Sequence, residues 1–92
     1  MSLDEQIPLE RFLALLEQRG DRPATVAAWR DSLERFIEFI ESEGVFNLRN
    51  VPMEVFFAFR LALVEQGVRG RIISRHEDRV IQFYTWLMKE ED

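Results

Sequence analysis

Four stretches of this 92-residue chain repeat their apolar residues with the period of an α-helix, and none alternates as a half-buried strand does. Glycines and prolines suited to helix ends separate these stretches, and the connections are short enough for a compact helical bundle. The spacing predicts helices over residues 8–19, 24–43, 52–66 and 71–90. In the loop before the third of these, Val45, Phe46 and Leu48 are expected to pack against the core. We therefore expect one all-α domain spanning residues 1–92. It should be a compact orthogonal bundle of four helices, or five, with flexible ends at residues 1–6 and 90–92.

Composition narrows the class of protein. A hydrophobic content of 47% argues against a disordered chain, and the absence of cysteine excludes disulfides. No apolar run approaches the roughly 20 residues of a membrane span, and the polar first six residues do not resemble a signal peptide. We expect a cytoplasmic protein with no membrane partner.

The residues that usually carry enzyme chemistry are sparse. There is one histidine, no metal-ligand spacing and no glycine-rich phosphate loop. Ser74, His76 and Glu77 look reactive as a string, but close neighbours on a helix point in different directions. We expect His76 to be packed and hydrogen-bonded at the edge of an apolar face. The chain is thus expected to have no catalytic residue, metal, cofactor or small-molecule substrate.

Charge is unevenly distributed along the chain. The net charge is −5, which by itself argues against nucleic-acid binding, yet residues 66–89 carry five basic and two acidic residues. On a helical projection Arg71, Arg75, Gln82 and Lys89 fall in one arc, with Arg79 at its border. Arginine is well suited to bind phosphate and guanine, so this arc is a candidate binding face.

The third predicted helix is apolar almost all round. Val55 and Phe59 lie on one face, and a second stripe of Phe57, Leu61 and Val64 lies about 140° away. The interpretation we favour is a central helix that is buried on two sides. The alternative is that the second stripe is a protein–protein contact.

A set of spaced residues resembles a known family. Thr25, Trp29, Leu33 and Phe36 follow the spacing T-x3-W-x3-L-x2-F, and the string FYTWL follows at residues 83–87. With the turn before Thr25, the proline at position 52 and an R-x7-F-Y pattern in the last helix, the sequence resembles the N-terminal SAM-like, core-binding domain of tyrosine recombinases and phage integrases. The resemblance covers residues 8–90.

The resemblance implies a domain that forms half of a clamp around duplex DNA, with its second and fourth helices toward the major groove. The partners implied are double-stranded DNA and other recombinase protomers on it, which would associate the protein with the nucleoid. The DNA-binding residues implied are Arg22, Thr25, Arg69, Arg71, Arg75, Arg79 and Gln82. Gln82 is the candidate base reader, since glutamine suits adenine in the major groove.

The resemblance also implies that the chemistry lies in a separate C-terminal domain absent from this chain, which is then not itself an enzyme. Tyr84 matches a core position of the family and is not expected to be its nucleophile.

Some features depart from the family pattern. Glu77 stands where an apolar residue is usual, and acidic residues surround Arg30 and Arg35 in the second helix. These features and the stripe of Phe57, Leu61 and Val64 motivate an alternative function: a helical protein-interaction module with the same fold and no DNA role.

The tripeptide Arg19-Gly20-Asp21 matches an adhesion motif, but in a cysteine-free chain we interpret it as a turn. Either Asp21 or Arg22 is then the N-cap of the second helix: Asp21 is the better capping residue, and a proline at N1 favours Arg22.

Overall fold

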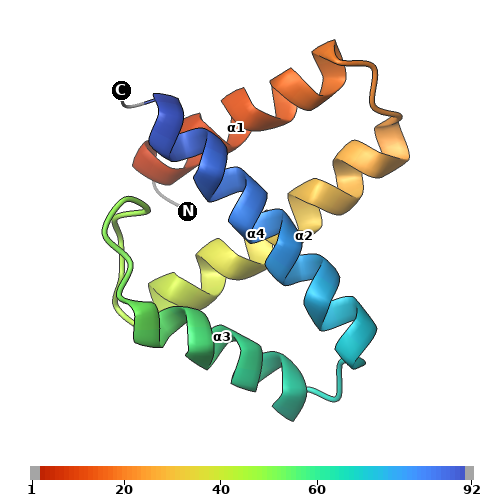
Figure 1. The fold of residues 1–92 in the computed structure, drawn as a ribbon. Helices are drawn as coiled ribbons and strands as arrows, with labels where there is room; N and C mark the ends of the chain where they lie inside the picture. Colours follow the sequence, from red (N-terminus) through yellow and green to blue (C-terminus); the bar gives the residue numbers. More distant parts are fainter. Residues whose placement is uncertain (1–2, 91–92) are drawn as a thin grey trace.

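The computed structural model describes residues 3–90, with side chains from residue 5 onward. Over that range the chain forms four α-helices and no strand: α1 (Leu3–Gln18), α2 (Pro23–Ser42), α3 (Met53–Glu65) and α4 (Gly70–Glu90). Figure 1 shows them as a bundle in which neighbouring helices cross at steep angles. The expected all-α class is confirmed, with four helices in the described part.

The start of α1 differs from the prediction. The helix begins at Leu3, not Pro8, and runs through Pro8, whose missing N–H leaves one helical bond unmade. Glu5 and Pro8 are both buried, so packing of this extra turn offsets the free-energy cost of the missing hydrogen bond. Of the ends expected to be flexible, residues 1–2 and 91–92 lie outside the described part. Residues 3–6 and Glu90 are helical.

Helices α2 and α4 form the centre of the domain. Each packs against all three other helices, whereas within the described residues no Cα atom of α1 lies within 8 Å of a Cα atom of α3. In Figure 1, α4 passes over the middle of α2, with α1 and α3 on opposite sides. The prediction that α3 is central and buried on two sides is therefore wrong. Its outer stripe faces away from the bundle because no further described helix covers it.

The core is made by the apolar faces that periodicity predicted. Phe36 is 1% exposed, and its ring lies 5.2 Å from the rings of both Phe56 and Phe59 and 6.0 Å from that of Tyr84. Leu48, in the connection between α2 and α3, is buried as expected. The fully buried apolar side chains include Leu9, Leu13, Leu33, Phe36, Ile37, Ile40, Ile73, Phe83 and Leu87.

Phe46 was expected to pack against the core but is 62% exposed. It lies in a non-helical connection, where no helical period dictates which way a side chain points. The hydrophobic pattern alone could not decide its burial.

A hydrogen-bonded pair lies where α2 meets α4. Ser32 is fully buried, and its Oγ lies 2.7 Å from Nδ1 of His76, which is 6% exposed. The expectation of a packed, hydrogen-bonded histidine is confirmed. Burial, and to a smaller extent the positive charges of Arg35 and Arg79, hold the pKa of His76 below its ordinary value, although Asp31 acts in the opposite direction.

The turn from α3 into α4 contains a backbone geometry that favours glycine. Gly67 has φ = 80°, and the N–H of Val68 donates to the carbonyl of Leu63 at 3.1 Å. This turn sets the direction in which α4 starts and so orients its first two turns.

Within residues 3–90, no helix is long and apolar enough to cross a membrane.

Replacing Phe36 with alanine should lower the free energy of unfolding by about 3–5 kcal/mol, because a cavity opens where three aromatic rings meet. The matched control is Phe46→Ala, which removes the same side chain from an exposed site and should change stability by less than about 0.5 kcal/mol. Urea denaturation measures both. Equal losses in the two variants would contradict the assigned core.

The lowered pKa of His76 predicts a stability that depends on pH. The unfolded chain takes up this proton more readily than the folded one, so the contribution of His76 is complete above about pH 6.5 and is lost as the pH falls through the folded pKa. His76→Asn keeps an acceptor near the Nδ1 position and does not titrate. Urea midpoints between neutral and mildly acidic pH should fall more for the unmodified chain than for this variant. Parallel curves would contradict the prediction.

Candidate nucleic-acid interface

The predicted DNA-binding residues lie on the first halves of α2 and α4 and around the crossing. In Figure 1 these two halves diverge from the crossing toward the same side of the molecule, like the arms of a V. Arg22 and Thr25 lie at the start of α2, on one arm, and Arg69, Arg71 and Arg75 at the start of α4, on the other. Arg79 lies at the crossing, where it contacts Ser32 of α2. Gln82 is exposed farther along α4.

At the start of α2, the side chain of Arg22 is not used to cap the helix. Arg22 is the N-cap residue, with φ = −67° and ψ = 150°, and its side chain makes no capping bond. Asp21 is engaged elsewhere, because the guanidinium of Arg19 donates to both its carboxylate oxygens at 2.8 and 2.9 Å. That bond holds the pKa of Asp21 below its usual range. The N-cap is thus Arg22, as the proline at N1 suggested.

The other arginines of α2 are neutralised within the domain. Arg30 donates to both carboxylate oxygens of Glu10, at 2.6 and 2.9 Å, and this contact lowers the pKa of Glu10. Arg35 donates to Asp31, one turn earlier, at 2.9 Å. Both are therefore weaker candidates for phosphate binding than their exposure alone suggests.

A different group of basic residues has no partner among residues 3–90. Elsewhere Arg11 pairs with Glu90 and Arg60 pairs with Glu77 across helices. The exposed basic side chains that make no hydrogen bond or ion pair within the described part are those of Arg22, Arg69, Arg71, Arg75 and Lys89. Four of these five come from the set that the resemblance implied. The two arms therefore carry positive charge that the fold does not neutralise, with Asp78 as an acidic neighbour on α4.

Arg79 is held differently from the other candidates. It is half-buried, its Nη1 donates to Ser32 Oγ at 3.0 Å, and its guanidinium carbon lies 5.9 Å from the centre of the Trp29 ring. No described carboxylate pairs with it. Ser32 was not predicted as part of the site. Its signal in the sequence was a small polar residue beside Leu33, on the apolar side of α2.

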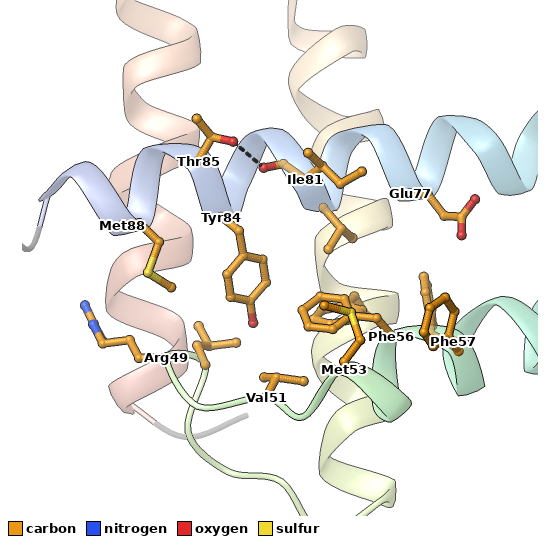
Figure 2. Close-up of a pocket in the computed structure, with 14 residues that line it drawn as sticks. Arg49, Val51, Met53, Phe56, Phe57, Glu77, Ile81, Tyr84, Thr85 and Met88 are labelled. Carbon is orange, nitrogen blue, oxygen red and sulfur yellow. Dashed lines mark hydrogen bonds between the residues drawn. The ribbon is translucent and has the colours of Figure 1, made fainter.

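The stripe on α3 is exposed. Phe57, Leu61 and Val64 are 65%, 62% and 54% exposed, which is unusual for three large apolar side chains on one helix face. Phe57 also borders a groove of about 570 Å³ between α3, α4 and the connection that precedes α3. Figure 2 shows Phe56, Ile81, Tyr84 and Met88 lining this groove.

Tyr84 points from α4 toward the connection that precedes α3 (Figure 2). Its hydroxyl is buried and has no hydrogen-bond partner among the described residues. Burial, with a smaller effect from Glu5, raises the pKa of this phenol. Because a nucleophile needs a lowered pKa or an adjacent base, the environment of Tyr84 agrees with a packing role.

Glu77, which departs from the family pattern, lines the groove and pairs with Arg60 of α3.

Within residues 3–90 no three histidine, aspartate or glutamate side chains are grouped closely enough to hold a metal ion.

Comparisons with known proteins agree with this geometry. The model of the family described as phage integrase, N-terminal SAM-like domain, matches residues 9–91. Three curated relatives are each called tyrosine recombinase XerC. The protein from Oceanobacillus iheyensis is 30% identical over 86 residues, which are 92% of this chain and 28% of the relative.

The relative from Herpetosiphon aurantiacus is 34% identical over 83 residues, 89% of this chain and 27% of its own length. That from Roseiflexus castenholzii is 31% identical over 86 residues, 92% of this chain and 27% of the relative. The chain thus spans about a quarter of the length of these relatives, and no solved structure matches it. Helical architecture, matched range and relatives agree: the chain belongs to the family of phage integrase N-terminal SAM-like domains.

Proposed function

We propose that this chain is the DNA-binding, core-binding domain of a tyrosine-type site-specific recombinase. In this proposal it holds duplex DNA for a catalytic domain outside the chain and works beside other recombinase protomers on the DNA, in the cytoplasm at the nucleoid. Arg22, Arg69, Arg71 and Arg75 supply phosphate contacts, Arg79 supplies one from the crossing, and Thr25 and Gln82 offer neutral hydrogen bonds.

The observation that carries the proposal is the partition of the basic residues. Arg11, Arg30, Arg35 and Arg60 are paired with carboxylates inside the domain. Arg22 at the start of α2 and Arg69, Arg71 and Arg75 at the start of α4 have no such partner within residues 3–90. A phosphate that approaches the arms therefore does not compete with an internal carboxylate for these guanidinium groups.

The shape of the site supports the same function. The first halves of α2 and α4 diverge from one crossing (Figure 1), so a rod-like duplex can contact both arms. Phosphate contacts of this kind fix position and supply affinity, whereas base edges supply specificity. The negative net charge of the whole chain weakens long-range attraction, so we expect modest affinity for the isolated domain.

Duplex binding should weaken when the arm arginines are replaced. Arg71→Gln and Arg75→Gln should each lower affinity for a short mixed-sequence duplex. Each should also reduce the slope of log affinity against log salt by about one unit, because one phosphate contact is lost. Fluorescence anisotropy over a salt series measures both quantities.

The matched control for this experiment is Arg60→Gln, which removes the same charge from α3, where the arginine already pairs with Glu77. It should leave the salt slope unchanged. Equal effects of all three substitutions would show that binding depends on net charge and not on the position of the arginines. Absence of duplex binding at low salt, in this chain and in any longer protein that contains it, would contradict the proposal.

A second candidate function rests on the exposed stripe and the adjoining groove. An apolar surface of this kind is typical of protein–protein contacts, and a protein-interaction module would need no DNA site.

A protein-contact role predicts association at micromolar concentration. Leu61→Glu should abolish that association, and because the side chain is exposed it should change the free energy of unfolding by less than about 0.5 kcal/mol. Sedimentation velocity of both proteins, with the exposed Glu54→Gln on the same helix as control, tests this. A monomer at every concentration would argue against self-association through α3.

A further inference from the structure

We propose that Ser32 and His76 are positioning residues that hold the guanidinium of Arg79 at the crossing of α2 and α4, aimed at a phosphate of duplex DNA. This inference rests on the proposed DNA-binding function. It adds two residues that do not themselves touch DNA, and it gives the reason why one arginine of the set is held when the others are not.

The contacts confine the guanidinium on two sides. Ser32 Oγ accepts a hydrogen bond from Nη1 of Arg79 at 3.0 Å, and the buried ring of Trp29 lies under the guanidinium carbon at 5.9 Å. Both Ser32 and Trp29 belong to α2, whereas Arg79 belongs to α4. The arginine is thus fixed to the opposite helix at the point where the two arms meet.

The direction of each hydrogen bond follows from the chemistry of the groups. A guanidinium can only donate, so the oxygen of Ser32 accepts from Arg79 and keeps one hydrogen of its own. Ser32 is fully buried, and His76 Nδ1, 2.7 Å away, is its remaining described partner. The chain of donors therefore runs from Arg79 to Ser32 to His76. It is complete when His76 is neutral and carries its proton on Nε2.

The environment of His76 favours that neutral form. From α2, Arg35 and Asp31 face the ring with opposite charges, and Arg79 adds a positive charge from α4 itself. Burial and the two arginines outweigh the aspartate and lower the pKa of His76. Nδ1 is then available as an acceptor near neutral pH.

A hydroxyl holds an arginine without neutralising it. Arg30 and Arg60 are also fixed in place, but by carboxylates that would compete with a phosphate. Arg79 is bound through one N–H to a neutral oxygen, so its remaining donors and its full charge stay available on a half-buried side chain. Holding a long side chain before binding removes part of the entropy cost of ordering it on DNA.

The test is a double-mutant cycle on duplex affinity, with Ser32→Ala and Arg79→Gln alone and combined. Ser32→Ala should raise the Kd for a short mixed-sequence duplex by about two- to ten-fold. In the Arg79→Gln background the same substitution should have no further effect, because no guanidinium is left to hold. A loss of the same size in both backgrounds would show a general structural role and overturn the inference, as would no loss with Arg79 present.

A measurement on the unmodified chain needs no substituted variant. Nitrogen relaxation of the arginine Nε groups should give Arg79 an order parameter above about 0.8, and the exposed Arg71 one below about 0.6. An Arg79 side chain as mobile as Arg71 would overturn the inference whatever the DNA result. If Arg79 is rigid but neither Arg71→Gln, Arg75→Gln nor Arg79→Gln weakens duplex binding, the proposed function fails and the phosphate-aiming role fails with it.

Discussion

The buried crossing of α2 and α4 joins the two helices that contact every other helix in the domain. Its apolar part includes the contact between the rings of Phe36 and Tyr84, and its polar part is formed by Ser32, His76 and Arg79. Close packing fixes where the helices meet, and the hydrogen bonds require a matching alignment of the facing groups. The angle between the two arms, and hence the spacing of the arginines on them, follows from this contact.

The charge of the domain has to be considered locally. A net charge of −5 describes the whole chain, yet several of its carboxylates are occupied by arginines on the same or a neighbouring helix. The arms of α2 and α4 keep basic groups outside those pairs. In the proposed function, a phosphate at short range meets the arms, while the net charge acts over distances that salt screens.

The sequence predicted most of the fold because helical periodicity and end signals are local properties. The four helices, the buried faces around Leu33 and Phe83, and the ending of α3 at Gly67 all needed only neighbouring residues. The wrong predictions concerned residues whose burial depends on which other parts of the chain pack against them. The extra turn before Pro8 is stabilised by burial against the bundle, Phe46 lies in a connection without periodicity, and the outer stripe of α3 meets no further described helix.

For the candidate site too, the features that depend on one helix were predictable and the contacts between helices were not. Exposed arginines on α4 follow from the helical projection, so their positions were expected. The contact of Arg79 with Ser32 was not, because it joins residues 47 apart in the chain and depends on where two helices cross. A polar residue beside Leu33 on the apolar side of α2 was the available sign. Its partner could be named only after α4 had been placed against it.

The absence of contact between α1 and α3 has a consequence for how this sequence can change over time. Because each flanking helix packs on the central pair alone, substitutions in α1 and α3 should affect stability additively, without the coupling found between touching residues. Each flank can therefore diversify on its own. The outer surface of α3 is free to acquire or lose a partner while α1 and the α2–α4 crossing retain the side chains that the arms require.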